Sequence, residues 1–210
     1  MSGASGTPYA AAVLRALLDA GESVDLVVSR AARLTLLDET GISYRDAHWQ
    51  DDLREWLARG ADGKPGTFQP AVDAVRHWSA GDLAAGPSSG SYPAKGMIVV
   101  PASTACVAGI ALGLSKDLLQ RAAGVTLKEG RKLVVAVRET PLNGQTLRHL
   151  VTLDDLGAAV VPASPGFYAG ATHIQDLVDF VAGRVLDSAG VPHGLYRRWK
   201  GDLGGSRTTT

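Results

Sequence analysis

The sequence predicts one α/β domain in which helices cover both faces of a parallel sheet. Apolar runs suited to buried strands alternate along the chain with segments of helical periodicity, and this alternation is typical of a parallel sheet. The 210 residues are enough to bury such a sheet in a single unit. We assign residues 1–200 to this domain and expect residues 201–210 to be a disordered tail.

The first half of the chain should open with a helix over residues 7–21, because Pro8 suits the first turn and Gly21 suits the end. We expect a strand at 23–29, then a short helix at 30–38 and a more polar one at 50–59. Gly, Pro and Lys between 60 and 70 indicate a surface loop. A short strand is expected at 72–78, and the Gly, Ser and Pro of residues 80–95 predict a mobile segment.

The second half continues the alternation of strands and helices. A buried strand at 96–102 precedes a helix of small residues at 103–114, and a further helix at 121–130 leads into a strand at 132–137. A helix around 145–156 precedes a strand at 157–163, and a long last helix over 171–190 should end near Gly190.

The start of the chain is irregular. Residues 3–6 (Gly-Ala-Ser-Gly) have the composition of a strand-to-helix turn, yet only Met1 and Ser2 precede them. In a doubly wound sheet the first strand is central, so losing it would expose backbone on both of its neighbours. We therefore expect native sequence upstream of Met1 to supply an apolar strand.

Composition argues against several classes of function. Acidic and basic residues balance, so no broad field favours nucleic acid or an anionic membrane. Cys106 is the only cysteine, which excludes an internal disulfide and suits a reducing cytosol. No ligand spacing predicts a metal site. The chain shows no basic-then-apolar leader and no long apolar run, so we expect a cytoplasmic protein that is neither exported nor membrane-spanning.

Small and hydroxylated residues form three turns at the carboxyl-end edge of the predicted sheet. This is the edge at which open α/β sheets bind ligands. Gly3, Ala4 and Ser5 form the first turn, Ser29 closes the strand at 23–29, and residues 103–106 (Ser-Thr-Ala-Cys) follow the strand at 96–102. Each turn alone has an ordinary structural explanation, since a serine that closes a strand is usually a helix cap. Together they indicate a nucleotide-like ligand. Cys106 itself is better explained as a small buried hydrophobe than as a nucleophile.

Charged residues mark the two ends of one helix-to-strand unit. Arg121 and Lys128 lie on the helix, whereas Arg138 and Glu139 follow the strand at 132–137. Several cations and one acid are suited to a site that binds a small phosphate group and transfers a proton next to it. Tyr168 follows the last strand in a turn with Gly and Pro that holds it at the ligand edge.

Three further residues have plain structural explanations when taken alone. Arg184 lies among apolar residues of the last helix, so either a buried carboxylate or a ligand phosphate should pair with it. Glu39 could be an ordinary surface acid, and Trp199 could simply anchor the tail.

These motifs resemble the UbiX/Pad1 flavin prenyltransferase family over nearly the whole chain, apart from the 50s to 70s. The resemblance rests above all on LKEGRKLVVAVRETPL (127–142) and PGFY (165–168), together with GASGTPY (3–9) and the stretch from PAST (101–104). It implies a three-layer, Rossmann- or flavodoxin-like sheet and a large homo-oligomer, commonly a dodecamer, with active sites at subunit interfaces. Members join the prenyl unit of dimethylallyl phosphate to reduced FMN at N5 and C6, without a metal. The prenylated FMN then serves a UbiD-type decarboxylase.

The resemblance also implies roles for particular residues. FMN would be held by Gly3, Ala4, Ser5, Ser29, Ser103, Thr104, Ala105, Cys106 and Arg138. The prenyl phosphate and the prenyl group would contact Ser89, Arg121, Lys128, Glu139, Tyr168, Arg184 and Trp199, some of them from a neighbouring subunit. The catalytic set would be Glu39, Lys128, Glu139, Tyr168 and Arg184.

The chain departs from the family pattern at a few positions. Ala102 replaces a common Cys, Ala105 and Cys106 replace a more usual pair, and Gly124 replaces a common Asp. Residues 143–145 (Asn-Gly-Gln) also differ from the usual sequence. These changes concern the choice of prenyl donor and the affinity for flavin more than the class of reaction.

Two alternatives from other classes remain. A decarboxylase of the phosphopantothenoylcysteine type shares the fold but needs a His after the second strand, and residues 30–40 contain none. A non-catalytic FMN-binding or delivery protein would tolerate neutral residues at positions 128, 139 and 184, whereas this chain keeps Lys128, Glu139 and Arg184.

Overall fold

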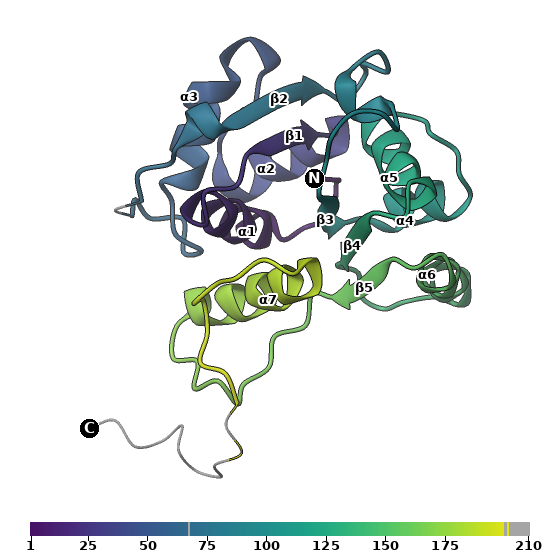
Figure 1. Cartoon of the computed structure of the whole chain (residues 1–210). Coiled ribbons are helices and arrows are strands. Elements are labelled where there is room, and N and C mark those ends of the chain that lie inside the picture. The colour runs from purple at the N-terminus through teal and green to yellow at the C-terminus, as the bar shows by residue number, and fades with distance from the viewer. Residues whose placement is uncertain (67, 200, 202–210) are drawn as a thin grey trace.

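The computed structural model describes residues 1–66, 68–199 and 201, and shows helices on both faces of a parallel sheet (Figure 1). Nearly all of the tail expected at 201–210 lies outside the described residues. The strands are β1 (Val24–Val28), β2 (Val75–Ser79), β3 (Gly96–Ala102), β4 (Lys132–Val137) and β5 (Ala159–Pro162). They pair in parallel as β1 with β2 and as β3-β4-β5, so the predicted α/β fold class is confirmed.

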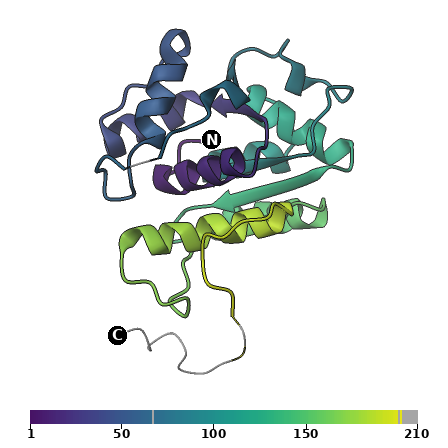
Figure 2. The same cartoon turned by 60° about the vertical axis from the view of Figure 1, so that its left-hand side comes forward.

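The helices are α1 (Thr7–Asp19), α2 (Arg30–Thr40), α3 (Trp49–Leu57), α4 (Thr104–Ala111), α5 (Leu118–Lys128), α6 (Gly144–Asp155) and α7 (Ile174–Ala189). Figure 2 shows α1 stacked on α7, and the two helices contact each other. Three short 3₁₀ turns, at Asp46–His48, Val72–Ala74 and Gly86–Ser88, lie in the connections.

Alternating side chains of the strands build two cores, one on each face of the sheet. In β4, Val134 and Ala136 join the core under α1, α3 and α7, whereas Leu133, Val135 and Val137 join the core under α4, α5 and α6. Successive side chains of a strand point to opposite faces, so a strand that is apolar at every position must be covered on both. This is why the run KLVVAV forms a central element of a three-layer fold.

One local prediction is wrong. Residues 80–95 were expected to be mobile, but hydrogen bonds tie them to the body of the domain. Arg121 Nε donates to the carbonyl of Ser88 at 3.0 Å, and Arg131 Nη2 donates to the carbonyl of Gly90 at 2.7 Å. These bonds fix the segment against α5. The composition could not show this, because both donors lie more than 30 residues away along the chain.

The sheet is interrupted in its middle, between β1 and β3. Of the residues that the structure describes, only Met1 and Ser2 lie there. The Met1 amine donates to the carbonyl of Val27 at 2.8 Å, Ser29 N donates to the Met1 carbonyl, and Ser2 N donates to the Pro101 carbonyl. These bonds have the pattern of a parallel ladder.

Ahead of Met1 lies a cavity of about 1030 Å³. Its lining includes residues of β1, β3 and the inner face of α1. The expected interruption at the position of a central strand is confirmed.

Candidate active site

The turns predicted to hold a ligand meet at the carboxyl ends of the strands. Ser29 N donates to the Met1 carbonyl at 3.1 Å, which joins the end of β1 to the N-terminal segment. Ser103 N donates to the Ser2 hydroxyl at 2.8 Å, which joins that segment to the end of β3. The three turns therefore form one continuous edge, as the sequence predicted.

The end of β4 joins the same edge through Arg138. Its backbone N donates to the carbonyl of Ala102 at 3.2 Å, and its Nε donates to the carbonyl of Ser5 at 3.0 Å. Glu139 is exposed beside it, and the N–H of Thr140 donates to Glu139 Oε1 at 3.1 Å. A cation and an acid thus stand next to the Gly-Ala-Ser turn.

Local packing explains the residue types in the first two turns. A Cβ on Gly3 would lie 2.4 Å from Cβ of Ala31, so only glycine lets the chain pass this close to α2. Ala4 is buried next to it. Ser29 is buried and caps α2, since its hydroxyl accepts from Ala32 N at 3.1 Å. The structural explanation of Ser29 as a cap is therefore correct, and its role toward FMN stays a prediction.

The first turn of α4 offers backbone donors at this edge. Ser103 caps the helix by accepting from Cys106 N at 3.3 Å. Within the described residues, the N–H groups of Thr104 and Ala105 have no hydrogen-bond partner. Free N–H groups at the start of a helix favour an anion or a carbonyl of a ligand. The thiol of Cys106 is buried, and burial raises its pKa to about 11, so it is a small hydrophobe as predicted.

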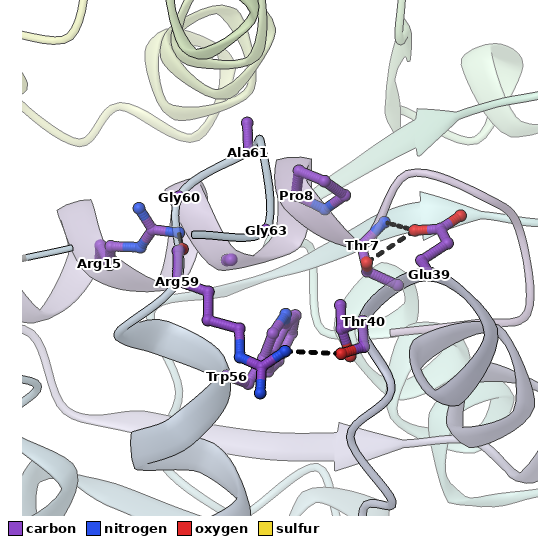
Figure 3. A pocket seen from close by; sticks show the side chains of 11 residues that line it. Thr7, Pro8, Arg15, Glu39, Thr40, Trp56, Arg59, Gly60, Ala61 and Gly63 are labelled. Atoms are coloured by element: carbon purple, nitrogen blue, oxygen red, sulfur yellow. Dashed lines mark hydrogen bonds between the residues drawn. The ribbon is translucent and has the colours of Figure 1, made fainter. Parts of the chain in front are cut away.

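Glu39 occupies the N-terminus of α1, which the sequence alone did not indicate. Its carboxylate accepts from Gly6 N at 2.9 Å. It also accepts from Thr7 N at 2.8 Å and from the Thr7 hydroxyl at 2.6 Å (Figure 3). Partial burial raises the pKa of Glu39, but hydrogen bonds from Thr7, Ser5 and Gly6 outweigh it and hold the pKa below its usual range. Glu39 is therefore an ionised cap of α1, placed next to Ser5.

The cavity beside Glu39 is too small for a flavin. It measures about 30 Å³ and is lined by residues of α1 and of the loop after α3, including Arg15 and Arg59 (Figure 3). Arg59 Nη1 donates to the carbonyl of Thr40, and Arg15 Nη2 donates to the carbonyl of Arg59. A space of this size holds about one or two waters. The predicted ligand edge lies elsewhere, at the carboxyl ends of the strands.

A second group of predicted residues lies on α5. Arg121 Nε bonds the Ser88 carbonyl, which brings Ser89 beside the helix. Lys128, at the end of α5, forms an ion pair with Glu129, and a Cβ on Gly90 would lie 2.7 Å from Lys128 Nζ. The loop that carries Ser89 thus runs along α5 from Arg121 to Lys128, the two predicted phosphate ligands of this helix.

Lys128, at the end of α5, lies at the opposite edge of the sheet from Glu139. Lys128 precedes the amino end of β4, whereas Arg138 and Glu139 follow its carboxyl end. At about 3.3 Å per residue, the six residues of β4 separate the two edges by roughly 17–20 Å. Within one chain, Lys128 and Glu139 cannot contact the same phosphate.

A third group lies on α7 and the two segments beside it. Tyr168 is 46% exposed, and its ring meets the ring of Phe180 edge to face at 5.4 Å. Trp199, 54% exposed, meets the other side of Tyr168 at 6.0 Å. Figures 1 and 2 both show the loop that carries Tyr168 and the C-terminal segment running together below α7. The structure therefore brings Tyr168 and Trp199 together, as the resemblance implied.

Arg184 is half-exposed, although the sequence suggested an apolar setting. Its Nη1 donates to Asp187 Oδ2 at 2.9 Å, so a carboxylate pairs with it as expected, but at the surface. The helix turns Arg184 away from the core because its neighbours Val181 and Val185 take the buried positions. Asp187 was not among the site residues that the sequence predicted. Its position three residues after Arg184 was the available signal.

The part of the chain that the structure describes holds no group of three or more His, Cys, Asp or Glu side chains that could bind a metal ion. Within residues 1–66, 68–199 and 201, none of the helices combines the length and the apolarity that a membrane crossing requires.

The family model and the relatives that match this chain are all flavoproteins of one kind. The model of the Flavoprotein family matches residues 1–186. A protein of Streptomyces coelicolor named flavin prenyltransferase UbiX is 86% identical over 209 residues, which cover 100% of this chain and 97% of that protein. UbiX of Pseudomonas aeruginosa is 35% identical over 201 residues, which cover 95% of this chain and 91% of that protein.

Two solved structures are similar along almost their whole length. The crystal structure of AnUbiX (PadA1) in complex with FMN and dimethylallyl pyrophosphate has a TM-score of 0.79 and 36% identity, and the match covers 96% of this chain and 95% of that one. A dodecameric FMN-dependent UbiX-like decarboxylase from Escherichia coli O157:H7 has a TM-score of 0.80 and 36% identity, with 96% and 97% covered.

Proposed function

The chain belongs to the family of UbiX flavin prenyltransferases, and we propose that it joins the dimethylallyl group of dimethylallyl phosphate to reduced FMN. The resemblance drawn from the sequence motifs is thereby confirmed at the level of the family. When bound, reduced FMN would supply N5, which takes the place of the phosphate on the prenyl unit, and C6, which bonds the prenyl unit when the new ring closes. The remaining chemistry, which is positioning, charge stabilisation and proton transfer, belongs to the residues of the chain.

The observation that carries the proposal is the convergence of four features at one sheet edge. The Gly3–Ser5 turn, the free N–H groups of Thr104 and Ala105, Arg138 and Glu139 all meet there. These groups fit a flavin mononucleotide, because its phosphate and ring carbonyls need donors and a cation, and Gly3 keeps the turn close to α2. Ser29, Ser103 and Cys106 complete the FMN site in this proposal.

Loss of phosphate from the allylic carbon needs positive charge placed in advance. In our proposal Arg121, Lys128 and Arg184 supply it, and the Tyr168 hydroxyl and Ser89 donate further hydrogen bonds. Trp199 covers the prenyl group beside Tyr168, in line with their ring contact at 6.0 Å. Each charged contact to the phosphate contributes about 1.5–3 kcal/mol. Removing one should slow turnover roughly 10- to 100-fold.

Glu139 transfers the proton during ring closure in this proposal. Its Oε1 accepts from Thr140 N, and its exposed carboxylate stands beside Arg138 at the flavin edge. Glu39 holds the α1 N-terminus next to Ser5 and so fixes the turn on which the flavin lies. Glu139 is therefore the acid that moves a proton, whereas Glu39 is the acid that shapes the site.

Assembly and cellular context extend the proposal. Because Lys128 and Glu139 lie at opposite edges of one chain, a complete site needs at least two chains, and we infer a homo-oligomer of the dodecameric kind described for the Escherichia coli relative. The prenylated FMN would pass to a UbiD-type decarboxylase. A cytoplasmic location fits the single buried thiol of Cys106.

The direct test is anaerobic incubation of the purified protein with reduced FMN and dimethylallyl phosphate, followed by mass analysis of the flavin. We expect a gain equal to one dimethylallyl unit less a hydrogen. No gain with this donor or with the pyrophosphate would leave an FMN carrier as the better description.

Glu139→Gln tests the assigned proton transfer. This variant should bind FMN as tightly as the wild type, because the amide keeps the shape of the side chain, yet it should fail to form the product. Normal turnover by Glu139→Gln would remove Glu139 from its role. Gln145→Glu, a substitution near the start of α6 that adds a carboxylate instead of removing one, serves as the surface control.

A further inference from the structure

Asp187 is the point at which α7 and the C-terminal segment are joined. Its Oδ2 accepts from Arg184 Nη1 at 2.9 Å and from the Tyr196 hydroxyl at 2.6 Å, and its Oδ1 accepts from Arg198 Nη2 at 2.8 Å and from His193 Nε2 at 3.1 Å. Three of these four donors lie in residues 191–199, and the fourth is a predicted phosphate ligand. The side chain of Asp187 is only 18% exposed. Its one carboxylate therefore binds both Arg184 on α7 and the C-terminal segment.

The charge state of this cluster is fixed. Partial burial would raise the pKa of Asp187, but hydrogen bonds from Arg198, Tyr196 and His193 outweigh it and hold the pKa far below its usual range. His193 Nδ1 accepts from Leu195 N at 3.2 Å, so the ring proton sits on Nε2 and is donated to Asp187. Arg184 and Arg198 carry two positive charges and Asp187 carries one negative charge, so these three side chains have a net charge of +1.

The backbone of α7 is adapted to the same contact. A Cβ on Gly183 would lie 2.5 Å from the ring of Tyr196 and 2.7 Å from the ring of His193. Glycine inside a helix costs about 1 kcal/mol relative to alanine, yet here it allows the C-terminal segment to lie directly on the helix. Tyr196 then contacts Phe180 at 5.0 Å, and Phe180 contacts Tyr168 at 5.4 Å.

We propose that Asp187 is a positioning residue of the prenyl-transfer site, which orients Arg184 and locks the C-terminal segment so that Trp199 stays on Tyr168. This inference rests on the proposed function. Arg184 uses Nη1 for Asp187 and Tyr196, and within the described residues its Nε and Nη2 have no hydrogen-bond partner. The guanidinium is thus held by one side while the other side is free for a phosphate. Asp187 itself does not touch substrate.

Asp187→Asn tests this role because the amide keeps the size of the side chain but replaces one acceptor oxygen by an NH2 group. That group faces side chains that can only donate hydrogen bonds to position 187. We expect the KM for dimethylallyl phosphate to rise about 10-fold or more while the Kd for FMN stays within about 2-fold, since FMN binds at the other end of the site. Trypsin should also cut after Arg198 faster, because the segment is released. Asp155→Asn, an exposed carboxylate at the end of α6, is the matched control and should change none of these values.

Milder variants keep the test decisive if Asp187→Asn does not fold. Tyr196→Phe removes one hydrogen bond to Asp187 and Arg198→Ala removes two, and each variant should raise the KM for the prenyl donor without weakening FMN binding. An unchanged KM in an active, folded set of variants overturns the role of Asp187, even if trypsin cuts faster. If the wild-type protein does not prenylate FMN, the proposed function falls, and the role of Asp187 in it falls too.

Discussion

Acetylation of the Met1 amine should stabilise the protein at low pH and have almost no effect above pH 8. Met1 is 8% exposed, and its amine donates to the Val27 carbonyl in the interruption of the sheet. Burial lowers the pKa of this amine from 8.0 to about 6. An acetyl group keeps the N–H bond to Val27, removes the charge and can enter the cavity of about 1030 Å³ ahead of it.

The expected size follows from the pKa difference. A pKa of 8.0 in the unfolded chain and about 6 in the folded chain means that the unfolded state binds the proton more tightly. At 1.36 kcal/mol per unit, the charge destabilises the folded protein by about 2.7 kcal/mol well below pH 6 and by about 1.4 kcal/mol at pH 7. The effect disappears above pH 8. Stability of the unmodified protein therefore rises between pH 6 and 8.

Urea unfolding at pH 5.5, 7.0 and 8.5 measures this difference in a preparation that begins at Met1. The acetylated protein should be more stable than the unmodified one by a margin that shrinks as the pH rises. An equal margin at pH 5.5 and 8.5 would show that packing of the acetyl group, not the charge, is responsible. No margin at any pH would show that the amine is not buried as described.

Two other changes probe the N-terminal edge. Five alternating apolar residues added ahead of Met1 should continue its ladder beside β1 and β3 and raise the Tm by several degrees in calorimetry, whereas the same extension with alternate prolines should not. Glu39→Ala should cost about 0.5–2 kcal/mol in urea unfolding, because α1 loses its cap. The pKa of Glu39 is lowered, so this contribution is present above about pH 4.5 and is lost as the pH falls. Asp38→Ala, an exposed neighbour, should cost far less.

The sequence predicted the strands well because their burial is encoded locally. KLVVAV is apolar between two charged ends, and β4 spans those same six residues. The last helix was expected to end near Gly190, and Gly190 adopts φ +79°, which favours glycine. Turn chemistry also identified the ligand edge, because Ser103 follows β3 as a cap and the carboxyl ends of parallel strands meet.

Contacts between distant segments could not be predicted in this way. Glu39 looks like a surface acid in the sequence, and only the fold shows that it caps α1 across 32 residues. Asp187 gains its importance from donors that reach it after the chain has turned back past Gly190. The separation of Lys128 from Glu139 also follows from topology: the two are close in sequence, but β4 puts them at opposite edges.

The central claim is that Lys128 of one chain and Glu139 of another complete one prenyl-transfer site. The most direct measurement co-expresses Lys128→Ala chains, which alone should be roughly 10- to 100-fold slower, with Glu139→Gln chains, which alone should form no product, and assays flavin prenylation by the mixed oligomer. Random pairing in a symmetric oligomer should restore both residues in about a quarter of the sites, and activity should return to that extent. Failure to recover any activity from verified mixed oligomers would contradict a shared site.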